Sequence, residues 1–181
     1  MKMLALALAA SGALALGAIS PAAASFESSQ AKEVAGDAAA AARQDLIDAF
    51  GKKSLKPGQY LWRKVDASGP ARVVVSLGDQ LAFLYKGDTL VAVSTISSGK
   101  SEKPTPEGIF PILDKKKFHR SVKYDNAPMP FMQRLDEYGI ALHGGVNPGY
   151  PASHGCIRLP MKFAEKLYGV TQVGSKVVIE G

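Results

Sequence analysis

The sequence predicts a mainly β fold with one or two short helices, and three observations indicate it. The chain has 181 residues, 46% of them apolar, which suits one compact domain with extra segments. Short runs of strand length recur beyond residue 70, separated by turn residues. A single clear amphipathic helix stands near the C-terminus. We therefore expect a mainly antiparallel sheet or sandwich.

Six runs in the second half of the chain are typical of strands. They are 72–77, 81–85, 89–96, 108–113, 140–142 and 176–179. The first three are joined by 77–80 and 86–88, whose glycine and aspartate predict hairpin turns. The helix is expected at 160–167, because Pro160 suits a first turn and Phe163, Ala164 and Leu167 share a face.

The N-terminus is typical of a secretory signal peptide. Lys2 precedes an apolar run over 4–19, and small residues over 21–25 suit cleavage, so we assign 1–24 to a leader. The alternative is a membrane anchor, but Ser11, Gly12 and Gly17 interrupt a run shorter than the roughly 20 apolar residues of a span. We expect export, with no stable membrane insertion after cleavage.

Residues 25–69 are interpreted as an N-terminal extension or spacer before a C-terminal domain at 70–181. The stretch 37–50 has good helix formers but few large apolar residues, which predicts a short surface helix or a spacer. Pro57 and Gly58 mark a turn, after which aromatic content rises.

The formal net charge is +6, which favours contact with polyanions such as anionic lipid headgroups or wall polymers. Nucleic acid is not expected as a partner of an exported protein. The lysine clusters at 52–53 and 115–117 are interpreted as solvated loop charges rather than a binding stripe.

The chain has a single cysteine, Cys156, which cannot form a disulfide within its own chain. His154 lies two positions before it and His143 thirteen positions before it. A cysteine nucleophile acts as the thiolate, and a nearby imidazole is the usual base. Residues 144–152 are rich in glycine and proline, so the chain can fold back and bring His143 to Cys156.

The surroundings of this pair favour acyl transfer. No acidic residue lies between His143 and Cys156, so a backbone carbonyl, that of Gly144, is expected to orient the imidazole. The backbone amides of Gly155 and Cys156 are expected to stabilise the oxyanion of a tetrahedral intermediate.

Other interpretations of the same residues stay open at this point. His143, His154 and Cys156, with His119, are potential zinc ligands, although the paired close-spaced ligands of a structural zinc site are lacking. Cys156 is also compatible with a buried structural role. Arg158 suits either an ion pair within the protein or a clamp for a substrate carboxylate.

The chain resembles the L,D-transpeptidase family at these residues. The family signature is a His-Gly followed after a loop by Ser-His-Gly-Cys, an aliphatic residue and Arg or Asn, and here it stands as 143–144 and 153–158. The similarity extends to 98–100, 104–110, 127–132 and 174–179, and covers 73–179 in all.

The resemblance implies a β-sandwich-like domain and a set of roles. Cys156 would be the nucleophile, His143 the general base and the Gly144 carbonyl its orienter, while His154 and Ser153 would support the site and Gly155 would contribute to the oxyanion hole. Arg158, Tyr124 and Met129 are expected to contact substrate. Family members cleave the bond between meso-diaminopimelate and D-alanine in peptidoglycan tetrapeptide stems through a thioester, with no metal or other cofactor.

The acyl acceptor differs among family members. It is an amine of another stem, which gives a 3–3 cross-link, a lipoprotein lysine, a D-amino acid or water. Arg158 is the common choice in bacteria with an outer membrane, so we expect the periplasm, with an outer-membrane lipoprotein as a further partner. The alternatives are an L,D-carboxypeptidase, a non-catalytic wall-binding module and a zinc-dependent peptidase.

Overall fold

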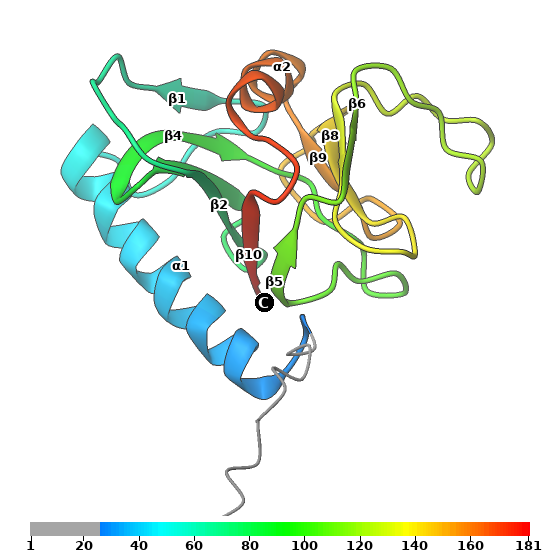
Figure 1. The fold of residues 1–181 in the computed structure, drawn as a ribbon, viewed down its shortest axis with the longest axis horizontal. Coiled ribbons are helices and arrows are strands. Elements are labelled where there is room, and N and C mark those ends of the chain that lie inside the picture. The colour runs from blue at the N-terminus through cyan, green and yellow to red at the C-terminus, as the bar shows by residue number, and fades with distance from the viewer. Residues whose placement is uncertain (1–25) are drawn as a thin grey trace, which may run out of the picture.

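The computed structural model describes residues 26–181, so the predicted leader at 1–24 lies outside the described residues. This part of the chain forms a six-stranded and a four-stranded sheet with two helices (Figure 1). The helices are α1 (Ser29–Phe50) and α2 (Met161–Val170). The larger sheet has the order β1-β4-β3-β2-β10-β5 and the smaller β6-β7-β8-β9. The strands are β1 (Tyr60–Trp62), β2 (Ala71–Ser76), β3 (Leu81–Lys86), β4 (Thr89–Thr95), β5 (Gly108–Pro111), β6 (Asp114–Lys116), β7 (Met132–Arg134), β8 (Ala141–Gly144), β9 (Ile157–Leu159) and β10 (Lys176–Glu180).

The prediction of a mainly β fold is confirmed, and the six expected strands correspond to β2, β3, β4, β5, β8 and β10. The two expected hairpins join β2 to β3 and β3 to β4, both antiparallel. Two pairings are parallel, β10 with β2 and β8 with β9. Four strands of three residues each, β1, β6, β7 and β9, were not expected, because so short a run shows no alternation.

The larger sheet is covered on both faces. On β2, Val73 and Val75 face a core shared with the smaller sheet and α2, whereas Val74 faces the opposite way, toward α1. Figure 1 shows α1 along one side of this sheet, with the smaller sheet and α2 on the other. The smaller sheet is therefore held by one face, and its other face is free to carry a site.

Helix α1 corrects the interpretation of 37–50 as a short surface helix or spacer. It has 22 residues, begins after the N-cap Ser28 and ends at Gly51, whose φ of 63° suits a left-handed C-cap. One face packs against the sheet through Ala31, Ala35, Ala39, Ala42 and Leu46. Small alanine side chains let a helix lie close to a sheet, so a stripe with little apolar volume is still fully buried.

Polar contacts fix α1 on the sheet as well. Arg43 donates hydrogen bonds to Asp79, to Ser76 Oγ at 3.0 Å and to Glu180 Oε1 at 2.9 Å. The Tyr85 hydroxyl donates to Asp45 Oδ2 at 2.6 Å, and burial, reinforced by this carboxylate, raises the pKa of Tyr85.

Lys115 is not the solvated loop charge that the sequence predicted. Its Nζ donates to the carbonyls of Tyr168 at 2.6 Å and Thr171 at 2.5 Å, at the C-terminal end of α2. A cation at a helix C-terminus satisfies carbonyls that have no partner within the helix. Partial burial lowers the pKa of this lysine.

Neither helix of residues 26–181 combines the length and the hydropathy that a membrane span requires.

Candidate active site

The register of β8 and β9 places Cys156 and His143, the predicted nucleophile and base, on the same side of the smaller sheet. Leu142 pairs with Ile157 and His143 with Arg158. Leu142 and Ile157 point into the main core, so His143 and Arg158 point to the opposite, outer face. Cys156 directly precedes Ile157 and therefore also projects from the outer face.

His143 is held by its own backbone. Its ring is only 8% exposed, and Nδ1 lies 2.9 Å from the Gly144 carbonyl, the contact that the sequence led us to expect. With the Nδ1–H donated to this oxygen, Nε2 is the unprotonated nitrogen and can accept a proton. Burial lowers the pKa of His143, and the positive charges of Arg158 and His119 lower it further against the opposing Gly144 bond.

The glycine after His143 lies directly against α2. A Cβ at Gly144 would lie 2.8 Å from Met161 Sδ and 3.4 Å from Ala164 Cβ, both on α2. A side chain at this position would point at the helix and away from the imidazole. A carboxylate there could not orient His143, whereas the carbonyl can.

The Cys156 thiol is half-buried on the outer face. It packs against Met129, Met132 and Ala141, and Sγ lies 3.6 Å from the Gly139 carbonyl rather than in a hydrogen bond with His143. Burial raises the pKa of Cys156, and the Ala141 backbone amide opposes this effect; the nearby charge of Asp136 raises the pKa further, and Arg158 lowers it. At neutral pH the group is therefore a thiol.

The turn before the cysteine is built by Ser153 and Gly155. Ser153 Oγ accepts from the Gly155 amide at 3.1 Å and donates to the Cys156 carbonyl at 2.5 Å. Gly155 has a φ of 112°, and a Cβ there would lie 2.6 Å from Ile140 Cδ1, so only glycine fits. Because Ser153 Oγ engages the Gly155 amide, an oxyanion role for this amide would require that bond to break, and the role expected for the Gly155 and Cys156 amides stays a prediction.

The sequence analysis did not identify Thr105, which links this turn to Gly99 through two hydrogen bonds. Its Oγ1 accepts from the Gly99 amide at 2.9 Å and donates to the Gly155 carbonyl at 2.8 Å. A Cβ at Gly99 would lie 2.1 Å from the Lys103 carbonyl and 2.9 Å from Gly155 Cα. Gly99 and Thr105 stand in the segments 98–100 and 104–110, which carry the family resemblance. That resemblance was the sequence feature that could have identified them as part of the site.

Arg158 braces the loop that leads to the cysteine. Its guanidinium donates to the Ala152 carbonyl at 2.5 Å and lies 3.5 Å from the Val146 carbonyl, and no ion pair of Arg158 occurs among the described residues. Asn147 anchors the same loop by donating to the Thr95 carbonyl at 2.8 Å. An ion pair within the protein, one of the two expected roles of Arg158, is thus replaced by bonds to backbone carbonyls.

The remaining predicted site residues are His154, Tyr124 and Met129, which differ in burial and contacts. His154 is exposed, and its ring stacks on Tyr124 with the centroids 4.7 Å apart and 20° between the planes. Met129 is buried in the cluster that contacts Cys156. Tyr124 and Met129 both come from the connection between β6 and β7, so this segment covers part of the site.

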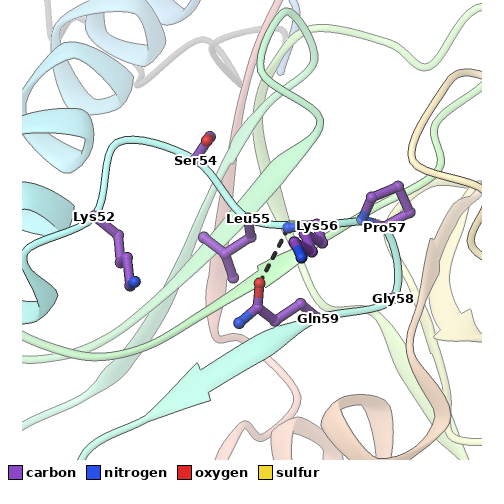
Figure 2. A pocket seen from close by; sticks show the side chains of 7 residues that line it. All are labelled: Lys52, Ser54, Leu55, Lys56, Pro57, Gly58 and Gln59. Carbon is purple, nitrogen blue, oxygen red and sulfur yellow. Dashed lines mark hydrogen bonds between the residues drawn. The ribbon is translucent and has the colours of Figure 1, made fainter.

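A hollow of about 630 Å³ lies beside the 144–152 loop and is open to solvent (Figure 2). It is lined by Lys52, Ser54, Leu55, Lys56, Pro57, Gly58 and Gln59. The Lys56 amide donates to Gln59 Oε1 at 3.1 Å, the bond drawn as a dashed line in Figure 2. The Pro57 ring would lie 2.6 Å from a Cβ at Gly149, whose φ is 84°. The segment between α1 and β1 thus packs directly on the 144–152 loop.

The zinc interpretation needs three or more converging ligands. No group of three His, Cys, Asp or Glu side chains is placed to hold a metal ion within residues 26–181. His154 stacks on Tyr124, and His143 donates Nδ1–H to a carbonyl.

Comparison with known proteins gives the family. A family model for the L,D-transpeptidase catalytic domain matches residues 70–179. The chain belongs to this family. A curated relative from Bacillus licheniformis, named as the L,D-transpeptidase YkuD, is 31% identical over 116 residues, which are 61% of this chain and 66% of the relative. The match thus spans slightly less than two thirds of that protein.

Solved L,D-transpeptidase structures share the fold. One from Stackebrandtia nassauensis has a TM-score of 0.59 at 23% identity, covering 76% of this chain and 65% of the other. L,D-transpeptidase 3 from Mycobacterium tuberculosis, solved with a faropenem-derived adduct, has a TM-score of 0.56 at 20% identity, covering 62% and 60%. The architecture of the two sheets is therefore that of L,D-transpeptidases.

Proposed function

We propose that this chain is a cysteine-dependent L,D-transpeptidase that acts on peptidoglycan tetrapeptide stems through a thioester on Cys156. The observation that carries the proposal is the shared outer face of β8 and β9, with His143 held by the Gly144 carbonyl so that Nε2 is free. Family membership supports the same assignment.

In the proposed reaction the thiol first leaves the Gly139 carbonyl by rotating about its Cα–Cβ bond toward His143. His143 Nε2 takes the thiol proton as sulfur attacks the carbonyl carbon between meso-diaminopimelate and D-alanine. The Cys156 amide stabilises the oxyanion. The imidazolium then gives its proton to the leaving amine, D-alanine departs, and a thioester remains.

An acceptor then attacks the thioester and restores the free thiol. The proposed acceptor is an amine of a second stem, which gives a 3–3 cross-link; a lipoprotein lysine, a D-amino acid or water would use the same thioester. We place the reaction in the periplasm, because the N-terminal sequence has the features of a signal peptide. Muropeptide profiles of a deletion strain distinguish 3–3 dimers, lipoprotein-linked stems and tripeptides.

Intact-mass measurement tests the nucleophile. After incubation with a tetrapeptide stem or a carbapenem, the wild type should gain the mass of one acyl group, and Cys156→Ala should gain none. His143→Gln, which cannot act as a base at Nε2, should acylate at least about a hundredfold more slowly, given the usual contribution of a general base.

A wild type that forms no adduct with either reagent contradicts the proposal. If it nevertheless binds peptidoglycan as tightly as Cys156→Ala does, a non-catalytic wall-binding module is the better description. Zinc in the purified protein, with activity lost on chelation, would favour the metallopeptidase instead.

A further inference from the structure

The connection between β6 and β7 forms an ordered arm that projects from the body of the molecule (Figure 1). We define the arm as residues 117–131. Its two sides are joined by backbone hydrogen bonds between pairs of residues, Phe131 to Lys117 at 2.9 Å, Met129 to His119 at 2.8 Å and Ser121 to Ala127 at 2.9 Å. The arm therefore presents a fixed surface.

Two large apolar side chains on the arm are exposed to solvent. Val122, at its tip, is 99% exposed, and Phe118 is 82% exposed, more than any other large apolar side chain among the described residues. Neither packs on the core, although Met129 at the base of the same arm does. Exposed apolar groups held in place on a projecting element indicate contact with something outside the molecule.

The same arm carries a net positive charge. Lys117, Arg120 and Lys123 are exposed in the arm and Lys116 directly precedes it at the end of β6, whereas Asp125 is the one acidic residue of 117–131. Within residues 26–181, the one ion pair among these four side chains is a solvent-exposed contact of Lys116 with Asp114 at 3.5 Å. The charges of the arm are thus largely available to an anionic partner.

The combination of charge and apolar exposure distinguishes between anionic partners. A soluble polyanion would use the basic side chains alone and would leave Val122 and Phe118 in water. The interface of an anionic bilayer takes both, because headgroup phosphates attract Lys and Arg while apolar side chains enter the boundary with the acyl chains.

We propose that the 117–131 arm docks reversibly on an anionic lipid bilayer, with Val122 and Phe118 in the interface and Lys117, Arg120 and Lys123 on the headgroup phosphates. The arm also contacts the candidate active site, through the stacking of Tyr124 on His154. Docking therefore holds the site beside the membrane surface. This inference does not depend on the proposed reaction.

Sedimentation with lipid vesicles tests the proposal, using the chain without residues 1–24. The wild type should bind phosphatidylglycerol vesicles and not phosphatidylcholine vesicles, more weakly at high salt. Val122→Ser and the Phe118→Ser/Val122→Ser pair should lower the affinity, the pair by at least about tenfold, because apolar insertion is lost. Lys117→Gln/Lys123→Gln should lower it by about fivefold for each charge removed.

Val173→Ser is the matched control, since Val173 is 62% exposed but stands after α2, outside the arm. It should bind as the wild type does, and all variants should keep the wild-type melting temperature. Three results would overturn the proposal. They are no binding of the wild type to anionic vesicles, equal binding of the wild type and Val122→Ser, and displacement by polyphosphate that is as complete as displacement by a second set of anionic vesicles.

Discussion

Burial acts on the two central residues in opposite directions on the pKa scale. It lowers the pKa of His143 and raises that of Cys156, because in each case the charged form loses solvation. At neutral pH both groups are thus uncharged, a thiol beside a neutral imidazole rather than a thiolate–imidazolium pair. In the proposed reaction, proton transfer would then accompany attack on the substrate instead of preceding it.

Alkylation of the thiol checks this protonation state. The rate of reaction of Cys156 with iodoacetamide should rise with pH through a midpoint above the value of about 8.5 for an unperturbed cysteine. Asp136→Asn should move the midpoint down, because the Asp136 charge is one of the causes that raise the pKa of Cys156. A wild-type midpoint near neutral pH would show an ion pair in the resting enzyme.

At the residue scale, the sequence was sufficient to predict hydrogen bonds between residues that are adjacent in the chain. His143 and Gly144 are adjacent, and their hydrogen bond could be anticipated. Thr105 could not be identified in this way, because its bond to the Gly155 carbonyl joins residues fifty positions apart. The engagement of the Gly155 amide by Ser153 was missed because it depends on a side-chain rotamer.

At the scale of elements, strands and hairpins were predicted where large apolar side chains and turn residues occur. The hairpins around Gly78 and Gly87 were predicted because glycine and aspartate separate short apolar runs of strand length. Helix α1 was underestimated because its buried face is mostly alanine, which carries a weak apolar signal. Its packing depends on the close approach of helix and sheet, which composition does not reveal.

Adjacent positions on α1 provide a test of its packing. Leu46 is 1% exposed against the sheet, so Leu46→Ala should lower the free energy of unfolding by about 2–5 kcal/mol. Ile47, one residue on, is 37% exposed, so Ile47→Ala should cost much less. Thermal or urea unfolding measures both, and equal losses would mean that α1 does not pack on the sheet in solution.

At the scale of the whole molecule, the segment before residue 70 is part of the folded body. The Ile109 amide donates to the Phe26 carbonyl at 2.8 Å, β1 pairs with the edge of β4, and Pro57 packs on Gly149. The family model covers 70–179, so these contacts join the matched domain to the segment that precedes it.

A chain that begins at residue 70 should therefore be much less stable than the complete folded part. Without α1 and β1, apolar side chains on β3 and β4 such as Phe83, Tyr85 and Val93 lose their cover. We expect a broad or much lower thermal transition by circular dichroism, with apolar dye binding in the native buffer. A truncated chain that melts as sharply and at the same temperature would show that the extension contributes no stability.

The Gly144 carbonyl gives the candidate base an unusual robustness to mutation. In enzymes where a carboxylate orients the histidine, one codon change can delete the acceptor and leave the wrong tautomer. Here the acceptor is a peptide oxygen, present whatever residue is encoded, so a point mutation can displace it only by moving the backbone. Loss of histidine orientation in this protein should therefore arise through mutations that disturb α2 at Met161 or Ala164, rather than through any change of a hydrogen-bonding side chain.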